Sequence, residues 1–309
     1  MSSITVFRPA PHELMSALRV FVGSQTGSDQ ELRAERCRDA LAAGDYDPDG
    51  LFATRNAAGR VNGAILVQVM PGALGVAWPP RGENEQIEDA LTQSACDWLQ
   101  KSGVKVCQAF ASSEERPDMA PLERNGFDRV TQLVFMRRDV DIMAGWGDSP
   151  GVPVRCCPWS GVLTVEQAGV LLATHEATLD CPELNGVRTP KEVLDGFSPG
   201  SPANCPWWHT IDEGAEPIGV LLFDKGPEPS VLELSYLGLI PSVRGRGLGG
   251  TALAFANRIA ASSGYQFVSV SVDARNEPAL RLYRRHGFVE TDRREVFLAQ
   301  WMKQEPRTK

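Results

Sequence analysis

The segment Val243-Arg244-Gly245-Arg246-Gly247-Leu248-Gly249-Gly250 has the composition of an anion-binding loop. It lies between an apolar stretch typical of a strand, Val231–Leu239, and a stretch with helical spacing, Gly249–Ala261. Glycines let backbone N–H groups point at one spot, and the start of a helix adds a positive dipole. The segment therefore predicts a phosphate site.

Three kinds of phosphate loop share this glycine-rich character. A Walker loop requires Gly-Lys-Ser/Thr after the glycines, where this chain has Leu248-Gly249. A Rossmann fingerprint matches by letter, with Gly245, Gly247 and Gly250 as GxGxxG and Asp273 about 20 residues later. However, the stretch from Gly250 to the end of the chain is too short for the sheet that a Rossmann fold builds after this loop. The third kind of phosphate loop is identified by a second motif further along the chain.

That second motif is Asn276-Glu-Pro-Ala-Leu-Arg-Leu-Tyr283-Arg-Arg-His-Gly287-Phe288, which follows a predicted strand at Phe267–Val272. Together with Arg244-x-x-Gly247-x-Gly249, it resembles the paired signatures of the GCN5-related N-acetyltransferases, the GNAT superfamily. The resemblance covers roughly Trp207 to Ala299. It implies acetyl-CoA as co-substrate and acyl transfer to an amine as the reaction.

The resemblance places the donor site along the glycine loop and the strand before it. In the family this strand splays from the next one, and pantetheine lies in the gap. The implied cofactor-binding residues are Leu237, Gly238, Leu239, Arg244, Gly245, Arg246, Gly247, Leu248, Gly249, Gly250 and Asn276. Asn276 would contact pantetheine, cap the last helix, or do both.

Two residues are candidates for proton transfer. Tyr283 would donate a proton to the departing thiolate, and Glu233, in an apolar strand that raises a carboxyl pKa, would take one from the amine. Strand alternation predicts that Glu233 shares a face with Ser235 and Leu237. Alternatively, Tyr283 is a tyrosine that only packs in the core, and Glu233 is a glutamate that only faces solvent.

Acceptor-side residues are expected between the two early helices of the C-terminal half. Asp180 and Glu183 lie there, and their carboxylates suit a cationic amine.

Landmarks recur along the chain at one offset in residue number. The pairs are Pro80 and Pro241, Ser102-Gly103 and Ser263-Gly264, Pro117 and Pro278, and Gly126-Phe127 and Gly287-Phe288. The offset is the same in all four pairs (241 − 80 = 161, and 263 − 102 = 161). The sequence therefore predicts two homologous modules.

The first module keeps the core landmarks and loses the chemical ones. At the same offset Arg244 corresponds to Glu83, Gly247 to Gln86, Gly249 to Glu88 and Tyr283 to Leu122. Carboxylates there would repel a pyrophosphate, so we expect a structural, regulatory or acceptor-shaping first module. Tandem members of the family also allow a second CoA in it.

The resulting fold prediction is α/β (α+β): two tandem GNAT-like domains, each with a mixed, mostly antiparallel sheet flanked by helices. Residues 139–153, with three glycines and two prolines, mark the boundary. We expect a degenerate domain at 1–138, a linker at 139–153 and a catalytic domain at 154–309.

Composition narrows the function classes. The net charge of −8 argues against a nucleic-acid binder, and no apolar run is long enough to span a membrane. Seven irregularly spaced cysteines, no CxxC and four histidines argue against a disulfide framework and a metal site. We expect a cytoplasmic protein.

The leading functional hypothesis is an acetyl-CoA-dependent N-acetyltransferase acting on a small-molecule primary amine by direct attack, with the C-terminal domain active. The alternatives are a protein or peptide N-acetyltransferase and a non-catalytic acyl-CoA sensor.

Overall fold

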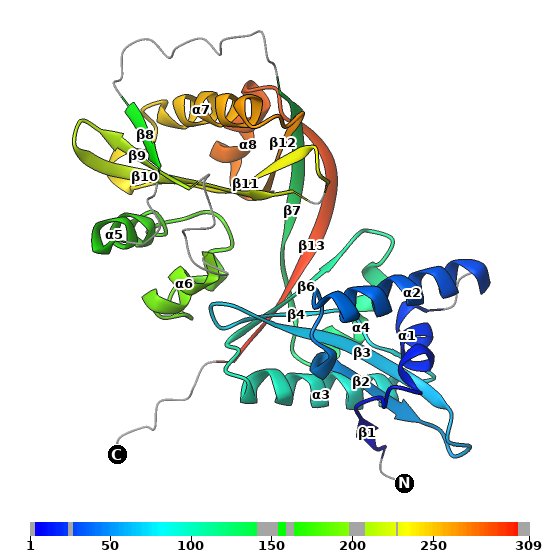
Figure 1. The fold of residues 1–309 in the computed structure, drawn as a ribbon. Helices are drawn as coiled ribbons and strands as arrows, with labels where there is room; N and C mark the ends of the chain where they lie inside the picture. Colours follow the sequence, from blue (N-terminus) through cyan, green and yellow to red (C-terminus); the bar gives the residue numbers. More distant parts are fainter. Residues whose placement is uncertain are drawn as a thin grey trace, which may run out of the picture. The chain divides into compact units, whose positions relative to one another are not determined.

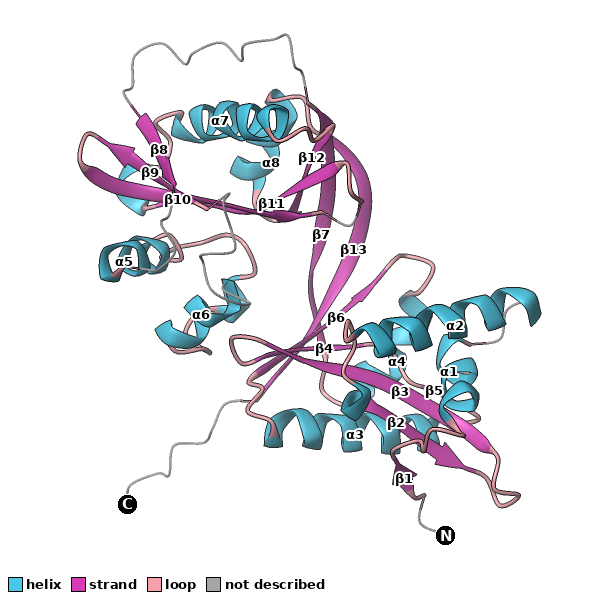
Figure 2. Cartoon of the chain, in the orientation of Figure 1, coloured by secondary structure: helices cyan, strands magenta, loops and turns pink. Residues whose placement is uncertain are grey.

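The computed structural model describes residues 4–23, 27–140, 154–158, 164–197, 208–226 and 228–301. The chain folds into two compact units, Met1–Val130 with Glu295–Lys309 (unit 1) and Thr131–Arg294 (unit 2). Figures 1 and 2 show their helices and strands. Residues 141–153 of the expected linker lie outside the described residues.

Unit 1 is a mixed sheet with helices on both faces. Its strand order is β1-β2-β3-β4-β6-β13, with β5 paired to β3. In chain order its elements are β1 (Val6–Phe7), α1 (Leu14–Val22), α2 (Gly27–Ala43), β2 (Leu51–Arg55), β3 (Val61–Met70), β4 (Leu74–Ala77), β5 (Arg81–Gly82), α3 (Glu85–Lys101), β6 (Val106–Ala111) and α4 (Ala120–Arg124).

Unit 2 repeats this plan, with strand order β7-β12-β11-β10-β9-β8. Its elements are β7 (Asp128–Asp139), β8 (Val154–Pro158), α5 (Val165–Ala173), α6 (Pro190–Phe197), β9 (His209–Glu213), β10 (Glu216–Lys225), β11 (Val231–Leu239), α7 (Leu248–Ser262), β12 (Phe267–Asp273), α8 (Glu277–Arg285) and the start of β13 (Val289–Gln300). All pairings are antiparallel except β11 with β12, and unit 1 likewise has one parallel pairing, β4 with β6.

The predicted repeat is confirmed by the order of the elements. β13 begins and ends at the predicted offset from β7 (289 − 128 = 161, and 300 − 139 = 161). β12 begins at the same offset from β6 (267 − 106 = 161). The two units therefore have the same order of elements, and these strands keep the predicted spacing.

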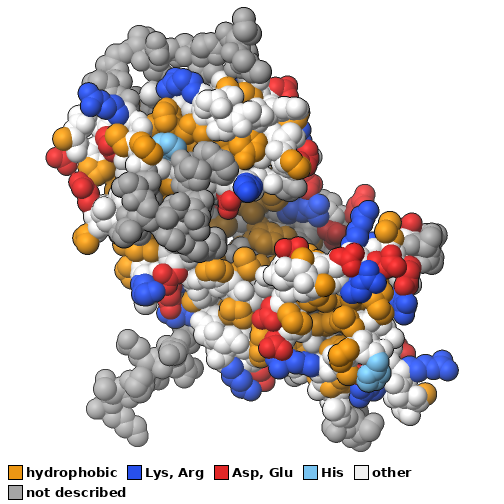
Figure 3. Space-filling model, in the orientation of Figure 1, with side chains coloured by type: hydrophobic (Ala, Val, Ile, Leu, Met, Phe, Trp, Pro, Cys, Tyr) orange, Lys and Arg blue, Asp and Glu red, His pale blue; other side chains and the backbone are white. Residues whose placement is uncertain are grey.

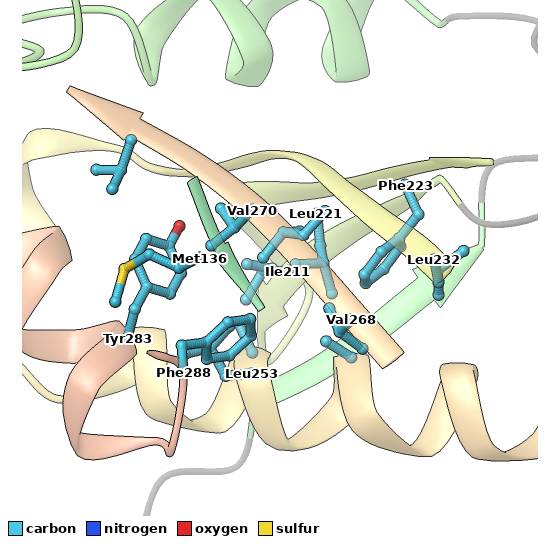
Figure 4. Close-up of a cluster of buried hydrophobic side chains, with 14 of the residues drawn as sticks. Met136, Ile211, Leu221, Phe223, Leu232, Leu253, Val268, Val270, Tyr283 and Phe288 are labelled. Atoms are coloured by element: carbon cyan, nitrogen blue, oxygen red, sulfur yellow. The ribbon is translucent and has the colours of Figure 1, made fainter. Parts of the chain in front are cut away.

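Apolar side chains on both faces of the unit 2 sheet explain its layers. Leu232 and Leu234 of β11 pack with residues of α7 and α8 in one core, whereas Tyr236 packs on the other face with residues of α5 and α6. Figure 1 shows these helix pairs on opposite faces of the sheet, and Figure 4 shows the larger core. The apolar run Ile218–Phe223 of β10 shows what burial on both faces requires, with Leu221 in the first core and Val220 in the second.

The last strand of each half of the sequence belongs largely to the unit that is built mainly from the other half. From Leu133 to Asp139, β7 pairs antiparallel with β12 in unit 2, and from Glu295 to Gln300, β13 pairs antiparallel with β6 in unit 1. The domain boundaries expected from the sequence placed β7 in the first domain and β13 in the second. Periodicity predicts that a strand forms but not its partner, so the sequence does not reveal this exchange.

Charged side chains of both signs are interspersed on the face shown in Figure 3. Ion pairs among the described residues include Arg55–Glu13 at 2.6 Å and Arg116–Glu123 at 2.7 Å. Within the described residues, no helix is long and apolar enough to cross a membrane, and the cysteines are free thiols.

The exchange predicts that core substitutions act on the unit that receives each strand. Met136 of β7 is 1% exposed in the unit 2 core, and Phe297 of β13 is 0% exposed in the unit 1 core. Truncation to alanine at such sites costs about 2–5 kcal/mol of unfolding free energy. Met136→Ala should speed amide hydrogen exchange in α7 and β12, and Phe297→Ala in α3 and β6, both measured by mass spectrometry. Faster hydrogen exchange in α3 and β6 for Met136→Ala, or in α7 and β12 for Phe297→Ala, would contradict this strand exchange.

Candidate functional site

The two parallel strands of unit 2 pair briefly and then diverge. β11 pairs with β12 at Val231, Leu232 and Glu233, and the rest of β11 to Leu239 has no β12 partner. Backbone groups on that edge of β11 are therefore available to an extended ligand, as at any exposed strand edge. The predicted splay is present, and Leu237, Gly238 and Leu239 lie on the diverging part.

A bulge in β11 changes which side chains share a face. Leu222 pairs with Tyr236 while Phe223 pairs with Leu234, so Ser235 is an extra residue in the strand. Leu237 consequently packs on the same core as Leu234, beside α7 and α8. The prediction that Glu233 and Leu237 share a face is wrong, because it assumed uninterrupted alternation.

The glycine loop has the backbone of an anion site. Gly245 and Gly247 have φ of 78° and 83°, a region that costs L-residues free energy, and a Cβ on either would meet no atom within 4 Å. Gly247 is the N-cap of α7 without a side-chain cap. Among the described residues, no backbone acceptor takes the N–H groups of Gly245, Arg246 or Gly247. The loop therefore presents available donors at the positive end of a helix.

The next three residues of the loop serve helix packing. Leu248 is 1% exposed in the unit 2 core. A Cβ on Gly249 would lie 2.7 Å from Leu282 of α8, and one on Gly250 would lie 3.0 Å from the His286 ring. These glycines let α7 approach α8 closely, a role that the motif alone does not separate from phosphate binding.

The two arginines of the loop are already engaged. Arg244 donates to three backbone carbonyls, those of Leu239, Ala177 and Thr174, at 2.9–3.0 Å. Arg246 forms a bidentate ion pair with Glu213, at 2.5 and 3.1 Å. Neither guanidinium is an uncommitted phosphate ligand in this structure.

Tyr283 lies at the edge of the core cluster, with its hydroxyl on the side away from Phe288 (Figure 4). It is 6% exposed, and no described residue is bonded to its hydroxyl. Burial raises the pKa of Tyr283 well above its ordinary value, and Asp180 and Tyr236 raise it further. The hydroxyl is thus protonated at neutral pH and free to donate, as the acid role requires.

Glu233 projects to the face opposite Leu232 and Leu234, opposite Asp224 of β10 in the strand register. Burial raises the pKa of Glu233, and the charge of Asp224 raises it further. A carboxylate with a raised pKa is a stronger base.

The sequence interpretation missed a polar centre at the end of β12. Asp273 is 0% exposed, and its carboxylate accepts hydrogen bonds from the Thr131 hydroxyl at 2.6 Å, the Cys181 amide at 3.0 Å and the Arg275 guanidinium at 2.8 Å. Burial alone would raise its pKa, but the hydrogen bonds from Arg275 and Thr131 outweigh it and lower the pKa to about 2. Asp273 is therefore an ionised structural centre. From the sequence it stood out only as the acidic residue of a Rossmann fingerprint, which gave no signal of this role.

Asp180 and Glu183 differ in what they contact. Glu183 forms a bidentate ion pair with Arg275 at 2.6 and 2.9 Å, which occupies its carboxylate. Asp180 accepts from the side chain of Asn276 at 3.1 Å and from the backbone of Asp273 at 3.2 Å, and burial raises its pKa. The Asn276 side-chain oxygen also caps α8 by accepting from Ala279 at 3.2 Å, as expected. The structure thus brings Asp180 and Asn276 together.

An aromatic group beside this region was also missed. His175 stacks on Tyr236 at 5.1 Å, and Phe197 of α6 contacts both rings. His175 Nδ1 lies 2.9 Å from the Leu171 carbonyl, so Nδ1 is the protonated nitrogen. These residues lie in no motif, and only the packing of α5 and α6 on β11 assembles them.

The corresponding place in unit 1 has different chemistry. The side chain of Asn84 caps α3 by accepting from Ile87 at 3.1 Å, and Glu85 and Glu88 lie in its first turn. β4 ends one residue after its last pairing with β6, at Ala77, so the parallel strands leave no long free edge. Leu122 is fully buried where unit 2 has Tyr283.

Within the described residues, no group of three or more His, Cys, Asp or Glu side chains is arranged to hold a metal ion.

The sequence has counterparts among known proteins. The model of the Acetyltransferase (GNAT) family matches residues 173–288. A mycothiol acetyltransferase of Jonesia denitrificans is 31% identical over 83 residues, which are 27% of this chain and 26% of that one. A mycothiol acetyltransferase of Pseudarthrobacter chlorophenolicus is 24% identical over 299 residues, 91% of this chain and 88% of that one.

The fold has counterparts among solved structures. A GCN5-related N-acetyltransferase from Sphaerobacter thermophilus matches with a TM-score of 0.56 at 18% identity, over 96% of this chain and 95% of that one. A tandem GNAT protein from the clavulanic acid biosynthesis pathway matches with a TM-score of 0.53 at 16% identity, over 98% of this chain and 100% of that one. The free edge of β11, the glycine loop, the repeated element order and these likenesses agree. Residues 173–288 match the GNAT family, and the whole chain has the fold of a tandem GNAT protein, with two units of the same fold.

Proposed function

We propose that the chain is an acetyl-CoA-dependent N-acetyltransferase that acetylates a primary amine of a small molecule in unit 2. The observation that carries the proposal is the coincidence of three features in that unit: a free edge on β11, available amide donors at the start of α7, and a protonated Tyr283 without a bonded partner among the described residues. In the corresponding positions of unit 1 that the structure describes, β4 has no long free edge, the Asn84 side chain caps α3, and Leu122 stands in place of the tyrosine.

Each feature has a distinct part in the reaction. The loop amides and the dipole of α7 would bind the pyrophosphate, and the edge of β11 would hydrogen-bond the extended arm and the thioester carbonyl. Glu233 would take a proton from the amine as its nitrogen attacks the carbonyl carbon. Tyr283 would give a proton to the sulfur as the carbon–sulfur bond breaks, so that the products are the acetamide and free CoA thiol.

The acceptor class is inferred from the relatives and from the acceptor side of unit 2. The relatives named above are mycothiol acetyltransferases, whose acceptor is a small molecule. Asp180 is an acidic group whose charge raises the pKa of Tyr283, and a carboxylate at this place is suited to orienting an amine. A screen of small primary amines, including amino sugars and cysteinyl amides, would find the acceptor by loss of thioester absorbance.

Tyr283→Phe separates an enzyme from an acyl-CoA sensor. Loss of the acid should lower kcat by about 100-fold or more, because general acid catalysis contributes on that order. The affinity for acetyl-CoA, measured by calorimetry, should change by less than about threefold, since the variant leaves the loop intact. Tyr46→Phe, in a half-buried tyrosine of unit 1, is the matched control. Unchanged turnover in Tyr283→Phe would remove the proposed acid.

The pH dependence of kcat tests the base. Activity should fall as pH drops through the pKa of Glu233, because only the carboxylate accepts a proton. Asp224 raises that pKa, so Asp224→Asn should move the acidic limb to lower pH. Glu216→Gln, an exposed residue of the same strand, is the control. If the acidic limb of the kcat profile does not move in Asp224→Asn, or remains in Glu233→Gln, a group other than Glu233 causes it.

A further inference from the structure

Residues 174–181, here called the strap, connect α5 to the short helical turn Pro182–Leu184. The strap contains two of the three non-glycine residues with positive φ in the described chain, Ala177 (51°) and Cys181 (41°). Such conformations cost free energy and persist where surrounding contacts impose them.

Those contacts come from both motif segments. Arg244 of the glycine loop binds the strap at its start, through the carbonyls of Thr174 and Ala177. Asn276 and Asp273 bind it near its end, through the Asp180 carboxylate and the Cys181 amide. The residues expected to hold the cofactor with their side chains therefore hold a segment of the protein.

Arg244 uses all three guanidinium nitrogens to hold the strap against β11. Its Nε donates to the Leu239 carbonyl at the end of β11, while its two terminal nitrogens donate to Ala177 and Thr174. One planar guanidinium thus ties the last residue of the free strand edge to the strap. Lysine, with a single nitrogen, cannot reproduce this three-way fork.

The strap also lies tightly against the donor strand. A Cβ on Gly238 would lie 2.7 Å from the Thr174 side chain, and the Thr174 hydroxyl lies 3.0 Å from the Tyr236 hydroxyl. At the far end of the strap, Asp180 is close enough to act electrostatically on Tyr283. A shift of the strap would therefore move Asp180 relative to the acid.

We infer that Arg244 is a positioning residue for the acceptor side of the site: it fixes the strap, and with it Asp180, against β11, and its side chain is not a phosphate ligand. The inference rests on the proposed function for its effect on catalysis. Binding of the pyrophosphate is left to backbone amides of the loop, which substitution of the Arg244 side chain leaves in place.

Arg244→Gln and Arg244→Lys test the inference together. For a phosphate ligand, Gln would weaken acetyl-CoA binding more than tenfold and Lys would restore it by charge. For a positioning residue, both variants should bind acetyl-CoA within about threefold of wild type by calorimetry, since amide donors at a helix start remain. Both should lower kcat/KM for the best amine from the screen at least tenfold.

Hydrogen exchange of the ligand-free protein gives a readout independent of activity. Protection of the His175, Thr178 and Cys181 amides, which are hydrogen-bonded in the strap, should fall in both variants while protection in α7 and β10 is retained. Arg281→Gln and Arg281→Lys, at an exposed arginine of α8 paired with Glu277, are the matched controls.

The outcomes separate the inference from the proposed function. Failure of the wild type to bind acetyl-CoA would overturn the proposed function. Normal wild-type binding with rescue by Lys but not Gln would overturn the positioning role. Unchanged strap protection, or protection lost throughout unit 2, would also overturn it.

Discussion

The divergence of β11 from β12 is the constraint on which unit 2 depends. Parallel strands normally continue side by side, because each unpaired backbone group in a buried sheet is costly. Here pairing stops after Glu233, and β11 continues to Leu239 with one edge free. The bulge at Ser235 falls on this diverging part and directs alternate residues to new faces. The edge is thus available to an extended acyl carrier, and the neighbouring groups must stabilise a sheet that is open on one side.

Asp273 and Arg244 stabilise the region where β11 and β12 diverge, Asp273 at the end of β12 and Arg244 at the end of β11. The buried carboxylate of Asp273 links β12 to Thr131 of β7, to Arg275 and to the Cys181 amide. Arg244 links the end of β11 to the start of the same strap. Because Thr131 belongs to an exchanged strand, a residue from the first half of the chain contributes to the polar centre of unit 2. The duplication therefore supplies structure to the second unit, whatever unit 1 itself binds.

Local patterns were enough to predict much of this molecule. The constant offset between landmarks predicted the repeat, and the two motifs indicated the family, because Gly245 and Gly247 require a left-handed backbone that few other residues adopt. Other features depend on tertiary pairing and left no local signal. The partners of β7 and β13, the bulge at Ser235 and the hydrogen bonds of Arg244 are of this kind. Glu183 was a reasonable acceptor ligand by charge, but the fold places Arg275 against it.

The central claim, that one acetyl-CoA binds at the start of α7, is tested most directly by calorimetric titration of wild type, Gly247→Asn and Gly247→Asp. Asn and Asp both tolerate the left-handed backbone at this position and are nearly isosteric, so they differ chiefly in charge. The account predicts one equivalent for wild type, weaker binding for Gly247→Asn and loss of binding for Gly247→Asp. Wild-type binding that persists in full in Gly247→Asp would place acetyl-CoA elsewhere and contradict it.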